Sequence, residues 1–131
     1  MTGRHSPKTY MRKAETALSS ARRNLQAGDG DGACDRAYYA MFNAAHAALF
    51  ALGIEGSAKP IKTHNGLMAK FGQEVVLPGH LAAAYGQDLN NVQKFRLVAD
   101  YTADSVNLAD AGWSVERAAA FVAAVKAKFS L

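Results

Sequence analysis

Apolar residues recur along most of this chain at intervals of three and four, which is the spacing of one face of an α-helix. Ser6 and Pro7 are typical of a helix start, and the first apolar stripe then continues to the glycine-rich turn at 28–32. The second stripe covers about 31–52 and ends at Gly53. Because the link between the two stripes is so short, we expect an antiparallel pair of helices.

Three more helices are expected in the second half of the chain. A short helix is expected to begin after Thr63, as its N-cap, and to end before the proline–glycine break at 78–79. A fourth helix is expected at about 80–101, and Ser114 is the expected N-cap of the fifth. The segment 102–112 suits either a helical extension or a loop. With no strand pattern, the sequence predicts an all-α, up-and-down bundle of four long helices and one short helix.

The stretch 35–46, in the middle of the second predicted helix, carries two distinctive faces. One is an ordinary core stripe that includes Tyr38, Met41 and Phe42. A solvent face would carry Lys, Glu and Gln, whereas the second face consists of Arg36, Tyr39, Asn43, His46 and Phe50. This composition predicts a second contact surface or a binding site, and the spacing alone leaves both interpretations open.

Length and composition narrow the class of protein. The 131 residues predict a single domain over 1–131, with a core that needs no disulfides. The single cysteine, Cys34, cannot form a disulfide within the chain and fits a reducing compartment. No apolar run approaches the roughly 18 residues of a membrane span, and no secretory signal follows Met1. We therefore expect a cytoplasmic protein without a membrane segment.

Positive charge is concentrated near the start of the chain. The net charge is +4, with six basic residues and one acidic residue up to Ala27, and nine basic and ten acidic residues beyond it. This basic segment is a candidate footprint for RNA or another polyanion. From the sequence alone we favour the simpler interpretation, a solvated helix face in a mildly basic protein.

Arg96 is the most informative residue of the fourth predicted helix, because it lies on the apolar stripe of that helix. An arginine stays charged, so a place near the core requires a partner, and Asp100 one turn later can supply it. One interpretation is a structural ion pair. The other is an arginine held to engage a phosphate or a transition-state oxyanion, and the sequence favours neither.

The four histidines show no metal-ligand spacing, and Cys34 has no second cysteine beside it, so we expect no metal and no cofactor. His46 shares a helix face with Arg36 and Asn43, which suits either acid–base chemistry or hydrogen-bonded packing between helices. His64 stands beside a predicted helix N-terminus, where it can meet an anion or assist the cap.

Three stretches of the chain resemble the signatures of a known family. They are D-R-A-Y-Y-A-M-F-N-A-A at 35–45, K-T-H-N-G at 62–66 followed by F-G at 71–72, and R-L-V-A-D-Y at 96–101. In this order they resemble the HEPN superfamily (higher eukaryotes and prokaryotes nucleotide-binding domain), in its small stand-alone prokaryotic branch. The resemblance covers nearly the whole chain. It implies a helical bundle that forms a homodimer, and a neighbouring minimal nucleotidyltransferase partner, often in a toxin–antitoxin or defence operon.

Many members of this superfamily are metal-independent endoribonucleases that use an arginine and, four to six residues later, a histidine. Arg96 matches the arginine, but Asp100 and Tyr101 stand where the histidine is expected. Asp35 also stands where serine is usual, and Asn43 where histidine is usual. The resemblance therefore implies the fold and a contact with RNA or a nucleotide, with an incomplete nuclease motif.

Two hypotheses follow. In the first, a dimeric module contacts RNA or a nucleotide; if it cuts RNA, Arg96 stabilises the phosphate and His46 or His64 supplies the missing acid–base group. In the second, the chain is a non-catalytic binding or scaffold subunit for the nucleotidyltransferase. The first hypothesis assigns catalysis to Arg96, Asp100, Tyr101 and His46, and ligand or RNA binding to Arg36, Tyr39, Asn43 and His64.

Overall fold

The structure is a computed structural model that describes residues 6–54 and 61–131. Within these ranges the chain forms five α-helices and one π-helical turn, and no strand, so the all-α prediction is confirmed. The elements are α1 (Pro7–Gln26), α2 (Gly30–Ala51), α3 (His64–Phe71), η1 (Gly72–Val76), α4 (Ala83–Tyr101) and α5 (Leu108–Phe129). The loop predicted between the second and third helices lies mostly outside the described residues.

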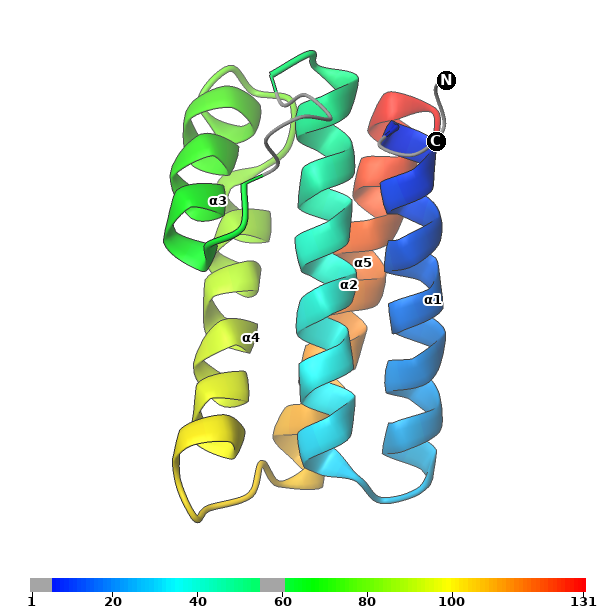
Figure 1. Ribbon diagram of the computed structural model, residues 1–131, viewed down its shortest axis with the longest axis vertical. Coiled ribbons are helices and arrows are strands. Elements are labelled where there is room, and N and C mark those ends of the chain that lie inside the picture. Colours follow the sequence, from blue (N-terminus) through cyan, green and yellow to red (C-terminus); the bar gives the residue numbers. More distant parts are fainter. Residues whose placement is uncertain (1–5, 55–60) are drawn as a thin grey trace.

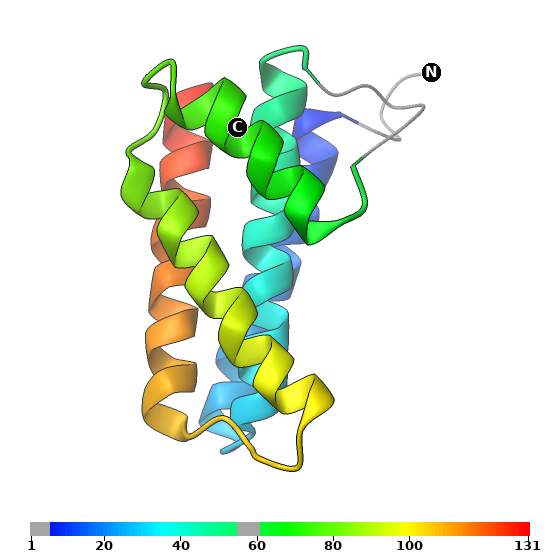
Figure 2. The ribbon, with the colours of Figure 1, turned by 90° about the vertical axis from the view of Figure 1, so that its left-hand side faces the viewer.

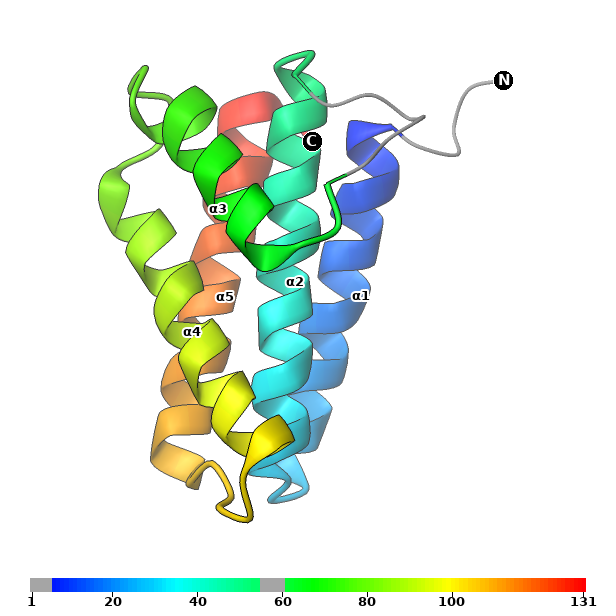
Figure 3. The ribbon, with the colours of Figure 1, turned by 60° about the vertical axis from the view of Figure 1, so that its left-hand side comes forward.

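The four long helices alternate in direction, as an up-and-down bundle requires (Figure 1). Helices α1 and α2 lie side by side, α5 packs behind them, and α4 lies on the far side of α2 from α1. Figures 2 and 3 show α4 leaning across the bundle, with the short α3 lying across the end where α4 begins. None of the helices in the described part of the chain is long and apolar enough to cross a membrane.

Side-chain caps begin four of the helices and account for most of the predicted boundaries. In each of these helices the side chain of the N-cap residue accepts a hydrogen bond from a backbone N–H of the first turn. The N-cap residues are Ser6 in α1, Asp29 in α2, Thr63 in α3 and Asn107 in α5. The caps predicted at Ser6 and Thr63 are therefore confirmed, and Asp29 caps the second helix.

Two predicted helix starts are wrong. Ser114 does not cap the last helix, because it lies fully buried inside α5, where its hydroxyl donates to the Asp110 carbonyl at 2.9 Å. The fourth helix begins at Ala83 and not at about residue 80. The backbone N–H of His80 instead donates to the Val75 carbonyl at 2.9 Å, which closes the turn after η1.

Small residues allow α2 to form the centre of the bundle. Its buried side includes seven alanines that are fully excluded from solvent, and α1 faces it with further buried alanines. Because such side chains are short, the helix axes can approach closely, and larger residues such as Met11, Met41 and Leu49 fill the remaining space. In the first turn of α2, Asp31 accepts a hydrogen bond from the backbone N–H of Val106 at 2.8 Å. This bond ties the α4–α5 loop to the start of α2.

Candidate functional site

Arg96 projects from α4 toward α2 and is surrounded by hydrogen-bond acceptors. Its Nε donates to Asp35 Oδ1 at 3.2 Å, its Nη1 to Gln93 Oε1 at 3.1 Å, and its Nη2 to the Tyr39 hydroxyl at 3.2 Å. The predicted pair with Asp100 is also present, with Oδ2 at 3.5 Å from Nε. We call these five residues the arginine cluster.

The cluster holds Arg96 as a fixed cation. Burial disfavours the charge of this side chain, which is 19% exposed, but Tyr39, Asp35 and Asp100 together raise the pKa of Arg96 above its ordinary value. The guanidinium also lies 4.9 Å from the ring centroid of Tyr38 and 5.1 Å from that of Tyr39. A positive charge in a partly dry setting interacts more strongly with an anion than the same charge in water.

His64 is connected to Arg96 through Tyr38. The Thr63 cap places His64 in the first turn of α3, where its Nδ1 lies 3.0 Å from the Tyr38 hydroxyl and its Nε2 lies 3.4 Å from Asn90 Oδ1. Arg96 stacks on the ring of Tyr38. The side chains of α2, α3 and α4 therefore form one continuous polar chain from the carboxylates around Arg96 to the imidazole.

The pKa shifts of His64 and Tyr38 favour the neutral forms of both side chains beside Arg96. Burial and the charge of Arg96 lower the pKa of His64, against the opposing effect of its hydrogen bond to Asn90. Burial raises the pKa of Tyr38 to about 12, which Arg96 only partly offsets. We therefore assign a protonated Tyr38 hydroxyl that donates to Nδ1, and an Nε2–H that donates to Asn90.

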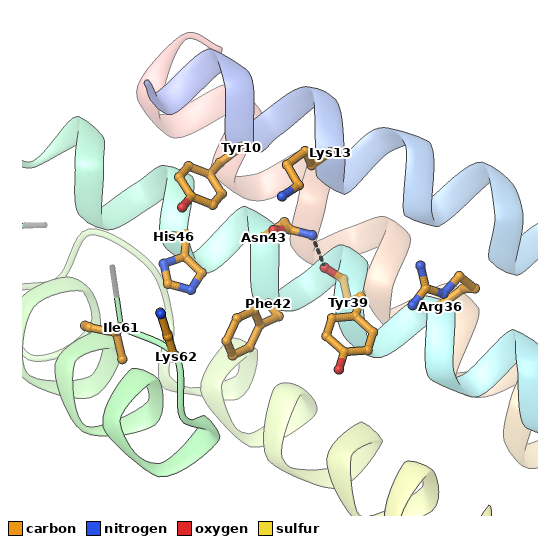
Figure 4. A pocket seen from close by; sticks show the side chains of 9 residues that line it. All are labelled: Tyr10, Lys13, Arg36, Tyr39, Phe42, Asn43, His46, Ile61 and Lys62. Carbon is orange, nitrogen blue, oxygen red and sulfur yellow. Dashed lines mark hydrogen bonds between the residues drawn. The ribbon is translucent and has the colours of Figure 1, made fainter. Parts of the chain in front are cut away.

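A second set of expected residues lines a hollow between α1 and α2, with a volume of about 400 Å³. Tyr10 and Lys13 of α1 face α2 across this hollow, and Lys62 enters it from the segment before α3 (Figure 4). The residues of the second predicted face of α2 that line it are Arg36, Tyr39, Asn43 and His46. The face thus contacts α1 and borders a hollow, and its role as a binding site stays a prediction.

The structure distributes the expected catalytic residues over different places. Arg96 and Asp100 lie together, and Tyr39 belongs both to the arginine cluster and to the lining of the hollow. Tyr101 is 78% exposed at the end of α4. His46 is 2% exposed and stacks against the ring of Tyr10, with 5.1 Å between centroids. The imidazole that the polar chain joins to Arg96 is His64.

Sequence reasoning missed several members of this site. Asn90, Gln93 and Arg96 recur at every third position, so they share one side of α4, and this polar spacing was an available signal. Asp35 reaches Arg96 across 61 positions, and no local pattern predicts that contact. Tyr38 was placed correctly in the core, since it is 2% exposed, but its hydroxyl also reaches His64.

Comparison with known proteins gives the family. The sequence model of the HEPN domain matches residues 7–128. This chain belongs to the HEPN domain family. It is 33% identical over 91 residues to "UPF0332 protein glr0978" of Gloeobacter violaceus. The aligned stretch covers 70% of this chain and 68% of that protein. It is 31% identical over 113 residues to "Putative toxin MJ0605" of Methanocaldococcus jannaschii, with 86% of this chain and 81% of that protein covered.

The matched region of this HEPN domain contains both the arginine cluster and the hollow between α1 and α2. Within the described residues, no group of His, Cys, Asp and Glu side chains could hold a metal ion. The arginine cluster and its neighbours hold a fixed cation, an imidazole with a lowered pKa and two tyrosine hydroxyls, which are groups that can bind an anion and transfer protons.

Proposed function

We propose that this HEPN domain is a toxin-like module that contacts RNA at the arginine cluster and cleaves it without a metal ion. The name of the Methanocaldococcus jannaschii relative supports the toxin-like role. The observation that carries the proposal is the arrangement in which Arg96, held cationic, stacks on the tyrosine that bonds a neutral His64. The two groups match the two needs of metal-free cleavage, charge stabilisation and proton transfer.

The partners of Arg96 leave it able to accept a phosphate. Asp35 and Asp100 face its Nε and fix the side chain in place, whereas its two Nη atoms donate to Gln93 and Tyr39, which are neutral. A phosphate oxygen that replaces a neutral acceptor forms a stronger, charge-assisted hydrogen bond. The carboxylates thus position the arginine, and its Nη edge is the part proposed to bind the RNA.

His64 is the proposed general base in place of the histidine that is missing after Arg96. A lowered pKa keeps its imidazole neutral near neutral pH, as proton abstraction from a 2′-hydroxyl requires. In the reaction the 2′-oxygen attacks phosphorus, and its proton passes to the Tyr38 oxygen as the Tyr38 hydroxyl proton moves to Nδ1 of His64. The 5′-oxygen leaves and takes a proton from water, while Arg96 stabilises the negative charge. Tyr38 thus relays the proton to the imidazole and also positions it, because its hydroxyl lies 3.0 Å from Nδ1.

Cleavage of several RNAs by the purified protein in EDTA tests this proposal. The wild type should cut RNA, and Arg96→Ala or His64→Gln should each reduce the rate by about 100-fold or more. His80→Gln is the matched control, because His80 lies beside Phe129 and not in the polar chain. No cleavage of any RNA by the wild type, or cleavage that survives Arg96→Ala, would overturn the proposal.

One observation favours a second candidate, a non-catalytic subunit that binds a minimal nucleotidyltransferase. All three donor atoms of the Arg96 guanidinium already have protein acceptors, as in an arginine that braces two helices. The outer face of α4 also exposes Leu97, Val98 and Tyr101, which suits contact with a second chain, including a second copy of this one. Sedimentation of the protein alone and with the nucleotidyltransferase measures both associations.

A further inference from the structure

The hollow between α1 and α2 continues into a second one along the same pair of helices. The second hollow has a volume of about 480 Å³ and shares Lys13, Arg36 and Asn43 with the first. Because three residues border both, the two hollows are neighbours along the α1–α2 pair, and we treat them together as one groove. We call it the basic groove, and its defining residues are Tyr10, Arg12, Lys13, Arg36, Asn43 and Lys62.

The basic groove carries positive charge that the described residues do not neutralise. None of its lining residues is acidic. Of its four cations, only Arg36 has an ion pair within 6–54 and 61–131, with Asp35 at 3.1 Å. Elsewhere Lys126 pairs with an acidic side chain of another helix. The other three cations of the groove converge from α1 and the segment before α3 without an ion pair among the described residues, and such an arrangement creates a positive potential that attracts polyanions.

Aromatic rings lie between these cations. The Arg36 guanidinium lies 4.9 Å from the ring centroid of Tyr39, and the Lys13 ammonium lies 5.7 Å from that of Tyr10. Phe42 forms part of the same lining. Cations interleaved with aromatic rings are typical of sites that hold a single-stranded nucleic acid. Because Tyr10 is buried and stacks on His46, the cations are the groups that would meet the strand here, through its phosphates. One ring with one cation would be enough for a mononucleotide, whereas this groove contains two such ring–cation pairs.

We infer that the basic groove binds a stretch of single-stranded RNA several nucleotides long, with phosphates on Arg12, Lys13 and Lys62. This inference rests on the proposed function and names the path that its substrate takes. The groove adjoins the arginine cluster in two ways: Tyr39 lines the groove and bonds Arg96, and Asp35 accepts hydrogen bonds from both Arg36 and Arg96. RNA in the groove is thereby directed toward Arg96.

Fluorescence anisotropy with a labelled single-stranded RNA of about 12 nucleotides tests the groove, with salt varied from about 50 to about 200 mM. The variant is Arg12→Ala/Lys13→Ala, at two exposed positions whose replacement leaves the core intact. Removing two phosphate contacts should lower the slope of log affinity against log salt by about 1.4, and weaken binding by on the order of tenfold. The control is Lys70→Ala/Lys94→Ala, which removes the same charge from α3 and α4 outside the groove and should bind like the wild type.

Three results would overturn the inference: unchanged binding by the groove variant, an equal loss in the control, or a dinucleotide that binds as tightly as the longer RNA. The cleavage assay in EDTA separates this inference from the proposed function. Groove-dependent binding without cleavage overturns the nuclease and leaves the groove. Cleavage that the groove variant does not affect, at RNA concentrations below saturation, overturns the groove and leaves the nuclease.

Discussion

Helices α2 and α4 face each other across the candidate site, yet they are held in the bundle by different forces. Helix α2 is packed on most sides by apolar side chains, and its buried residues extend from its first turn to Leu49. Helix α4 buries Gly86, Leu89 and Val92, all in its first half. In its second half no side chain is fully buried: Phe95 and Ala99 pack only partly against the core, and Arg96 adds polar contacts with α2.

The difference separates the part of the molecule that provides most of its stability from the part that we propose binds RNA. Apolar burial is non-directional and provides most of the free energy of folding, which here comes from α1, α2 and α5. Polar contacts contribute less, but they fix the position of a charged group and can exchange with a ligand. The lightly packed helix therefore carries the arginine, in agreement with the general placement of binding elements in the less stable parts of a fold.

The largest expected effect tests the apolar side of this comparison. Met41→Ala in α2 removes a side chain that is fully buried and should lower the free energy of unfolding by about 2–5 kcal/mol. Leu97→Ala in α4, where the side chain is 38% exposed, should change it by less than about 0.5 kcal/mol. Urea denaturation measures both values. Similar losses at the two positions would mean that α4 is packed as firmly as α2.

A middle-sized effect is expected at the polar contact between the two helices. Arg96→Ala leaves Asp35 and Asp100 without their shared cation and should cost about 1–3 kcal/mol of unfolding free energy. Arg117→Ala is the matched control, since its pair with Asp88 is longer, at 3.6 Å, and Arg117 is 40% exposed. That loss should stay below about 1 kcal/mol. Equal losses in urea denaturation would show that Arg96 does not hold α4 to α2.

The two regions also differ in how far the sequence predicts them. Apolar periodicity and local caps were enough to predict the helices of the bundle, because each of these signals lies within one helix, as at Ser6 and Thr63. The i, i+4 pair of Arg96 and Asp100 was predictable for the same reason.

The remaining contacts of the site depend on how separate helices pack. The bonds from Arg96 to Asp35 and from Tyr38 to His64 join residues on different helices, 61 and 26 positions apart. They exist only after α2, α3 and α4 have packed, and helical spacing carries no information about that packing. The position of Ser114 could not be predicted for the same reason. It lies inside α5 because the helix begins earlier, after a loop that is fixed by a contact with α2.

The smallest expected effect concerns His64, the only imidazole joined to this polar contact in the described part of the chain. Folding lowers its pKa below the ordinary value of 6.5, so in the interval between the two values the unfolded chain binds more protons than the folded one. The contribution of the neutral imidazole to stability is thus complete above pH 6.5 and is lost as the pH falls through the folded pKa. His64→Gln should flatten this part of the dependence when unfolding is compared between about pH 7.5 and about pH 5.5, whereas His80→Gln should keep it. If both variants followed the wild-type curve, His64 would be no more than a residue beside a helix cap, and the polar chain would end at Tyr38.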